Sequence, residues 1–262
     1  MESLLAFWSQ AGADACFVDT PVDRLAARQA PPPKSLGRAV APTQSAAAAR
    51  VAPDLAAAIQ QARDLAAEAQ TLEALEAAIA GFDGCGLKFE GAKRAVFARG
   101  APDAPVMIIG EGPGAEEDAQ GSPFVGRAGQ LLDKMLAAAG LTDRVFITNT
   151  VFWRPPGNRT PTPAEQMVCA PFLQRAITLV KPRYLMLAGG AAAKAVLKRE
   201  EGILSLRGRW FDWTSEDGTL QLPALPTLHP AFLLRQPGAK KRAWADLLTL
   251  SERVDRPDRP EG

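Results

Sequence analysis

The chain has 262 residues, of which 47% are hydrophobic, and its 30 lysines and arginines are balanced by 29 aspartates and glutamates. These values are typical of a globular protein with one large domain, or one domain with a terminal appendage, and the apolar runs are too short to cross a membrane. The N-terminus has an acidic Glu2 and no early basic cluster, which argues against a secretory signal and predicts a cytoplasmic protein.

Histidine and cysteine usage excludes several kinds of metal site. His229 is the only histidine of the chain, so a site built from several histidines cannot form. Cys16, Cys85 and Cys169 show no CxxC spacing, which excludes a disulfide framework and a zinc signature.

The charges are unevenly distributed along a chain whose net charge is close to zero. Acidic residues gather at 63–76 and 111–118, whereas basic residues gather at 88–99 and 235–242. Proteins that bind nucleic acids are often basic overall. A local basic edge can nevertheless bind phosphate groups in a neutral chain, so the composition does not exclude a nucleic-acid partner.

The first 80 residues divide into three segments. Residues 1–29 begin with a short helical pattern, and the Ala/Pro-rich residues 30–53 are typical of a flexible linker. Residues 54–80 are rich in Ala, Leu, Glu and Gln, and they predict two helices with a break near Gln70 and Thr71. This part of the chain either docks a partner protein or caps the domain that follows, and we favour capping by the two helices.

A domain is predicted for residues 81–252, followed by a polar tail at 253–262. In it, short apolar runs alternate with helical segments. The predicted strands are 106–109, 145–148, 184–188 and 224–228, and the predicted helices are 127–139, 163–180, 190–199 and 239–252. Strands without polar alternation are buried on both faces. The pattern therefore predicts an α/β fold, a three-layer α/β/α sandwich with a short, mostly parallel central sheet.

Functional residues of such folds follow the carboxyl ends of the strands. The first predicted strand is followed by the sequence GEGPG at 110–114, a turn that lets backbone approach a ligand closely. A tight strand-to-helix turn explains it equally well, because it lacks both the P-loop ending and the dinucleotide-binding spacing. Phe124 lies nearby in a loop between proline and glycine residues. It is poorly placed for core packing there and well placed to stack on a planar ligand such as a base.

Two further strands end in candidate polar residues. Asn149 carries both a donor and an acceptor and can pair with an imide edge, although a turn-forming asparagine is the alternative. His229 follows the last strand and is fixed by Pro230, and a purely structural histidine is the alternative there. A loop after His229 leads through Leu233 and Leu234 into basic residues, which is the combination needed to push an apolar wedge into a base stack while holding the backbone.

Together, three stretches resemble the uracil-DNA glycosylase superfamily and most closely its type-4 members. They are GEGPGAEEDAQGSPFVGRAGQLLD, with Gly112 where alanine is usual, WRPPGNRTPTPAEQMVC, and LHPAFLLRQPGAKKRAWADL. The resemblance covers roughly residues 80–250. It implies removal of uracil from single- or double-stranded DNA by hydrolysis of the N-glycosidic bond, by a monomeric DNA-repair enzyme.

The resemblance also implies a role for each motif residue. Phe124 stacks on the extruded uracil, Asn149 bonds its polar edge, and His229 stabilises the negative charge on the leaving base. Glu111 places the attacking water, and the backbone around Gly112 and Gly114 contacts the base or a phosphate. The residues expected to contact DNA are Leu233, Leu234, Arg235, Lys240, Lys241 and Arg242.

One departure concerns the 4Fe-4S cluster that type-4 enzymes usually hold with four cysteines. Cys85 and Cys169 match the second and fourth cysteine positions, but Phe82 and Trp153 occupy the first and third. Two thiolates cannot hold such a cluster in the usual way, so we expect no cluster, no other metal and no cofactor. Aromatic packing is expected to fill the space.

Two alternatives to an active glycosylase stay open. One is a silent or weakly active reader that binds uracil-containing DNA, although such a protein needs no catalytic histidine. The other is an α/β nucleotide hydrolase that uses GEGPG for phosphate, although the chain lacks the Lys-Ser/Thr pair after the glycine turn. The sole tyrosine, Tyr184, lies in a predicted core strand and is not expected to exclude a 5-methyl group from the site.

Overall fold

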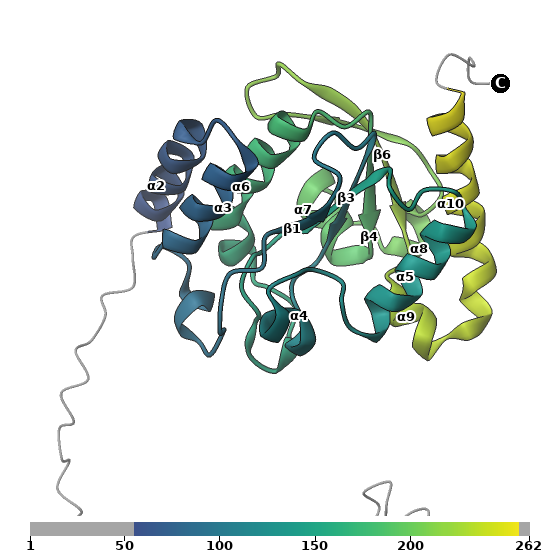
Figure 1. Ribbon diagram of the computed structural model, residues 1–262, viewed down its shortest axis with the longest axis horizontal. Coiled ribbons are helices and arrows are strands. Elements are labelled where there is room, and N and C mark those ends of the chain that lie inside the picture. The colour runs from purple at the N-terminus through teal and green to yellow at the C-terminus, as the bar shows by residue number, and fades with distance from the viewer. Residues whose placement is uncertain (1–54, 257–262) are drawn as a thin grey trace, which may run out of the picture. The chain divides into compact units, whose positions relative to one another are not determined.

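The computed structural model describes residues 55–256 (Figure 1). The expectations for residues 1–29 and 30–53, including Cys16, and for the end of the tail at 257–262 lie outside the described residues. Among the described residues, no helix is both long enough and apolar enough to span a membrane.

A six-stranded sheet forms the centre of the fold, with the order β1-β3-β2-β4-β6-β5. The four inner strands are parallel, and both edge strands run antiparallel to their neighbours. The strands are β1 (Ala98–Gly100), β2 (Val106–Gly110), β3 (Val145–Asn149), β4 (Tyr184–Ala188), β5 (Phe211–Thr214) and β6 (Gln221–Thr227). The predicted α/β class with a short, mostly parallel sheet is therefore confirmed.

Helices cover both faces of the sheet. The helices are α2 (Leu55–Glu68), α3 (Leu72–Gly81), α4 (Ala115–Gln120), α5 (Arg127–Ala138), α6 (Pro163–Val180), α7 (Gly190–Leu197), α8 (Ile203–Leu206), α9 (Pro230–Arg235) and α10 (Lys240–Asp255), with 3-10 turns at Gly86–Phe89 (η2), Pro156–Asn158 (η3) and Pro237–Ala239 (η4). Helices α2, α3 and α6 lie on one side, whereas α5 and α10 lie on the other (Figure 1).

Alternating side chains of the strands supply the two hydrophobic cores. In β2, Met107 and Ile109 pack in the cluster that includes α2, α3, α6 and α7, whereas Val106 and Ile108 pack in the cluster of α5 and α10. All five residues of β2 are buried. A strand that is apolar on both faces is thus explained by helices on both sides, and the sandwich is confirmed.

The helical segment before the domain consists of two helices separated at residues 69–71, where the sequence predicts the break. Thr71 caps α3, because its side chain accepts a hydrogen bond from the Ala74 N–H. Helices α2 and α3 pack on α6, and α2 contributes small buried residues such as Ala62 to the contact.

The sequence did not predict several short elements. Strands β1 and β5 have three and four residues, too few to show a clear period. The stretch after His229, expected as a loop, forms the six-residue helix α9. Helix α10 continues to Asp255 and buries Val254, so regular structure extends three residues beyond the predicted start of the polar tail.

Candidate active site

The ends of four neighbouring strands bring the candidate residues together. Gly110 and Asn149 end β2 and β3 and are paired in the strand register. Gly189 follows β4, and His229 follows β6 after one residue. These four strands are adjacent and parallel, so residues separated by more than 100 positions in sequence share one edge of the sheet, as expected for a site in such a fold.

Asn149 has a buried side-chain oxygen at this edge that lacks a hydrogen-bond partner among the described residues. The residue is 1% exposed, and the oxygen in question is Oδ1. A buried acceptor without a donor costs about 1–3 kcal/mol. Such a group can accept a hydrogen bond from a donor that enters the site.

Gly110 allows the side chains of Asn149 and Phe124 to approach the same point of the backbone. A Cβ atom added at Gly110 would overlap Asn149 Oδ1 and lie 2.6 Å from two ring carbons of Phe124. The amide oxygen and the aromatic ring therefore both border the same point of the backbone. This places a polar contact and a flat apolar surface next to each other, which is what a nucleobase requires.

Phe124 is held in an unusual backbone conformation. Its φ is +54°, in the left-handed region that costs an aromatic residue on the order of 1–3 kcal/mol. The side chain is 6% exposed and belongs to the hydrophobic cluster of α5 and α10. The expectation that it is poorly placed for core packing is therefore wrong, because the loop folds back onto the sheet. Its ring centroid lies 5.6 Å from that of His229, with the planes 31° apart.

His229 has a defined tautomer. Its Nδ1 accepts a hydrogen bond from the Ala231 N–H at 3.1 Å, so the proton of the neutral ring is on Nε2. Burial of the ring, followed by the nearby charge of Arg235, lowers the pKa of His229 to about 4. The imidazole is therefore neutral at physiological pH and presents an Nε2–H donor.

Gly189 allows His229 to lie close to β4. A Cβ atom at Gly189 would lie 2.9 Å from the Cβ of His229, and the φ of Gly189 is +102°. The Gly189 N–H also donates to the Thr227 carbonyl at 2.9 Å. A glycine is thus required here for both conformation and space.

Several backbone groups of the GEGPG turn are already engaged in hydrogen bonds. The Gly114 N–H donates to Glu117 Oε2 at 3.0 Å, so the expectation that it contacts a base or phosphate has to be corrected. The Glu111 carbonyl accepts a hydrogen bond from the Thr150 hydroxyl at 2.6 Å, and this bond joins the turn to the end of β3. Glu111 itself is partly exposed. Gly112 fits closely against Val151, since a Cβ there would be 2.9 Å from a valine methyl group.

The residues expected to contact DNA divide into two groups. Leu233 is fully buried and packs with Leu228 and Ala243, so the expectation that it enters the base stack is wrong. Helix α9 turns it inwards and leaves Leu234 37% exposed. The other members of the set are exposed at the end of α9 and in the first turn of α10: Arg235, Lys240, Lys241 and Arg242.

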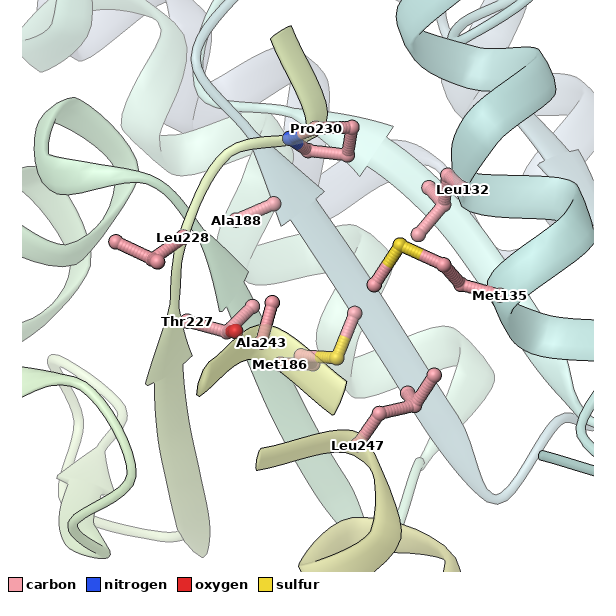
Figure 2. Close-up of a pocket in the computed structure, with 9 residues that line it drawn as sticks. All are labelled: Leu132, Met135, Met186, Ala188, Thr227, Leu228, Pro230, Ala243 and Leu247. Carbon is pink, nitrogen blue, oxygen red and sulfur yellow. The ribbon is translucent and has the colours of Figure 1, made fainter. Parts of the chain in front are cut away.

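A small cavity lies behind this edge, between the sheet and helices α5 and α10 (Figure 2). Its volume is about 10 Å³, and its lining is almost wholly apolar, with Leu132, Met186 and Leu247 among its members. A space of this size holds at most one water molecule. It is a packing gap and not a base-binding pocket.

The fold and the site together define an α/β protein that receives a planar, hydrogen-bonding ligand at the carboxyl edge of its sheet. The chain belongs to the Uracil DNA glycosylase superfamily, whose sequence profile matches residues 97–248. This finding confirms the resemblance identified in the sequence.

Three of the similar proteins are each named Type-4 uracil-DNA glycosylase. The protein of Thermotoga maritima is 40% identical over 142 residues, which cover 53% of this chain and 71% of the relative. That of Pyrobaculum aerophilum is 39% identical over 182 residues, or 67% of this chain and 91% of the relative. That of Sulfurisphaera tokodaii is 36% identical over 171 residues, or 63% of this chain and 77% of the relative.

The residues at the four cluster positions do not fit a 4Fe-4S cluster. Phe82 and Trp153 are each 1% exposed, with ring centroids 6.5 Å apart, and Phe82 also packs edge-on against Phe172 at 5.2 Å. Interaction with the Cys85 side chain, followed by burial, raises the pKa of the Cys169 thiol well above its usual value. Within residues 55–256, no group of three or more His, Cys, Asp or Glu side chains is placed to hold a metal ion.

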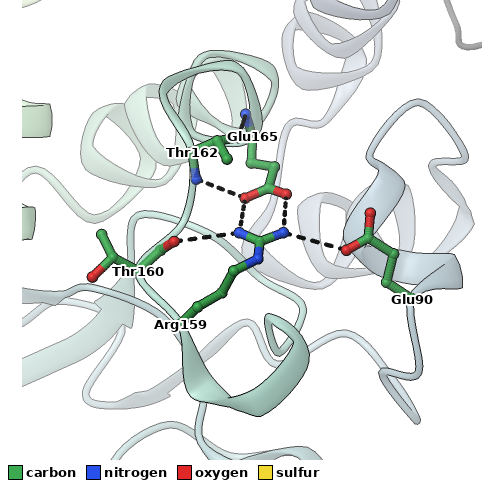
Figure 3. Close-up of polar contacts among 5 residues, drawn as sticks. All are labelled: Glu90, Arg159, Thr160, Thr162 and Glu165. Carbon is green, nitrogen blue, oxygen red and sulfur yellow. Dashed lines mark hydrogen bonds and ion pairs between the residues drawn. The ribbon is translucent and has the colours of Figure 1, made fainter. Parts of the chain in front are cut away.

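Arg159 connects the segments around these positions (Figure 3). Its guanidinium makes two hydrogen bonds to Glu165, at 2.9 and 2.7 Å, and one to Glu90 at 3.3 Å. Glu165 lies in the first turn of α6 and also accepts the Thr162 N–H at 2.7 Å. The paired guanidinium and these bonds lower the pKa of Glu165. The network ties the turn after η2 to the start of α6.

Proposed function

We propose that the chain is a DNA-repair enzyme that flips uracil out of DNA and hydrolyses its N-glycosidic bond, leaving an abasic site. The observation that carries this proposal is the buried, unpaired Oδ1 of Asn149 beside the Phe124 ring. Uracil presents an imide N–H flanked by carbonyl oxygens, and an asparagine side chain can accept from the first and donate to a carbonyl. Phe124 supports the flat face of the same base.

Binding begins with extrusion of the base. Unstacking costs a few kcal/mol, which contacts on the DNA offset. The exposed Leu234 on α9 fills the space left in the stack, and the adjacent basic residues hold the phosphates. We propose that the enzyme acts as a monomer, on single- or double-stranded DNA.

Bond cleavage leaves the sugar with oxocarbenium character and the base with negative charge. The neutral His229 donates its Nε2–H to an oxygen of the departing base. A donor aimed at developing charge is worth about 3–4 kcal/mol. Glu111, at the end of β2, orients the water whose oxygen bonds to the anomeric carbon, and a water proton completes the released base.

The chemistry needs no metal, and we propose that the chain works without a 4Fe-4S cluster. The buried rings of Phe82 and Trp153, and the presence of thiols at only the other two of the four cluster positions, Cys85 and Cys169, support this part. Anaerobically purified protein is expected to contain less than about one iron per chain and to lack thiolate-to-iron absorbance. Iron near four per chain would contradict it.

The experiment that tests the function is base release from an oligonucleotide with a single uracil, in single- and double-stranded form. Wild type is expected to release uracil, and His229→Ala is expected to be about 100-fold slower or worse. Arg144→Met is a suitable control, because Arg144 pairs with Asp255 outside the site. Tight binding without release would favour the silent reader, and phosphate release from nucleoside triphosphates would favour the nucleotide hydrolase.

A further inference from the structure

We propose that Arg99 and Glu117 are positioning residues that hold Phe124 in its strained conformation and thereby set the base-stacking surface. This inference rests on the proposed function of Phe124. It concerns two charged residues to which the sequence analysis gives no role. They lie on different elements, Arg99 in β1 and Glu117 in α4.

Arg99 binds the two peptide carbonyls that flank Phe124, those of residues 123 and 124. Its Nε donates to the Pro123 carbonyl at 2.8 Å, and its Nη2 donates to the Phe124 carbonyl at 3.2 Å. The same Nη2 pairs with Asp133 of α5 at 2.6 Å. The guanidinium fork can bind two adjacent carbonyls in a fixed geometry, which a lysine cannot reproduce.

Glu117 holds the backbone on the C-terminal side of Phe124. Its Oε1 accepts the Val125 N–H at 3.0 Å and the Gly126 N–H at 2.9 Å. Its Oε2 accepts the Gly114 N–H at 3.0 Å. One carboxylate therefore joins the loop of Phe124 to the GEGPG turn, and bonds to a charged acceptor are stronger than neutral ones.

The two charges bind consecutive backbone groups around Phe124. The Arg99 guanidinium binds the carbonyls of residues 123 and 124, and the Glu117 carboxylate binds the N–H groups of residues 125 and 126. Gly129 packs directly against the backbone of Phe124, because a Cβ atom at Gly129 would overlap the Phe124 carbonyl. A φ of +54° is unfavourable for phenylalanine and persists only where surrounding contacts fix it. The contacts of Arg99, Glu117 and Gly129 fix the backbone of Phe124 in this way.

The ring direction follows from this backbone geometry. The ring borders Gly110 and lies against His229, so a loop that relaxes moves the ring relative to both the amide and the imidazole. Loss of either charged residue is therefore expected to weaken binding of the extruded base and to slow release. A displacement of about 1 Å can cost roughly 100-fold in rate.

A double-mutant cycle with Phe124 tests the inference. In the wild-type background, Arg99→Met is expected to lower single-turnover uracil release at least about tenfold. In the Phe124→Ala background, where no ring remains to be positioned, it is expected to cost less than about threefold. Glu117→Gln should show the same coupling. Arg144→Met is the matched control, since its ion pair with Asp255 is also 2.6 Å long, and it should be neutral in both backgrounds.

Four outcomes of these experiments are distinguished. Equal losses from Arg99→Met in both backgrounds would overturn the inference, because Arg99 would then act independently of Phe124. Arg99→Lys keeps the charge without the fork, so recovery of full activity by this variant would also overturn it. If Arg99→Met fails to melt cooperatively, the cycle is decided by Glu117→Gln. Absence of uracil release by the wild type would refute the proposed function instead, and this is measured first.

Discussion

Replacement of Gly110 by alanine tests the geometry of the base site with the smallest possible change. The added methyl carbon overlaps Asn149 Oδ1 and lies 2.6 Å from Phe124 ring carbons. Carbon atoms in contact are normally about 3.5–4.0 Å apart. The ring must therefore retreat by roughly 1 Å, and the amide must turn away from the same point.

Neither neighbour can yield without cost. Asn149 and Phe124 are both buried, and the backbone of Phe124 is fixed by the contacts with Arg99 and Glu117. A misplacement of about 1 Å at a reacting centre costs about 100-fold, which corresponds to about 2.7 kcal/mol in the activation free energy. Crowding a packed site with one methyl group is expected to lower the unfolding free energy by about 1–3 kcal/mol, which leaves the protein folded.

Single-turnover release of uracil with excess enzyme measures this effect, and thermal unfolding followed by circular dichroism reports the fold. Gly81→Ala is the matched control, because a Cβ at Gly81 meets nothing within 4 Å. It should keep both activity and melting temperature. Release by Gly110→Ala within about threefold of wild type would refute the proposed contacts of the base with Asn149 and Phe124.

Three further predictions concern pH, a buried ion pair and the DNA wedge. Since the pKa of His229 is about 4 in the folded protein, below its ordinary value of 6.5, the unfolded chain binds more protons between these values. The free energy of unfolding therefore falls as the pH falls. In denaturant titrations at about pH 7.5 and pH 5, wild type is expected to lose about 2 kcal/mol more unfolding free energy than His229→Gln. An equal loss in the two proteins would contradict the lowered pKa of His229. Asp246 is buried, pairs with Arg207 and accepts from the Thr227 hydroxyl, so Asp246→Ala should cost about 3 kcal/mol of unfolding free energy, and a cost below about 1 kcal/mol in urea titration would exclude this role. Leu234→Ala should slow release from duplex about tenfold and leave single-stranded substrate unaffected, whereas a defect equal on both substrates would remove Leu234 from the wedge.

The sequence predicts the sheet well because the inner strands are buried on both faces. The runs at 106–109, 145–148 and 184–188 coincide with β2, β3 and β4 to within one residue. Because the strands are parallel, residues that directly follow them lie at the same carboxyl edge of the sheet. For that reason Asn149 and His229, identified individually with a structural alternative for each, meet at the same edge.

The contacts of individual side chains could not be predicted in the same way. Leu233 and Leu234 are identical neighbours in sequence, and only the turn of α9 buries one and exposes the other. The Gly114 N–H is engaged by Glu117, which the sequence shows merely as one member of an acidic cluster. Arg99 reaches Phe124 from a strand of three residues, and such a short strand carries no periodic signal.

The packing of Phe82 and Trp153 has a consequence for engineering of the chain. Phe82 contacts both Trp153 and Phe172, and a Cβ at Gly84 would overlap its ring, so the ring fits closely among its neighbours. Replacing one of the two rings by cysteine would open a cavity, at about 3–5 kcal/mol for truncation of a large aromatic residue, while still leaving one of four thiolate ligands missing. A four-thiolate metal site can therefore be installed here only by replacing both rings together, and each single replacement lowers the stability of the chain before any metal can compensate for it.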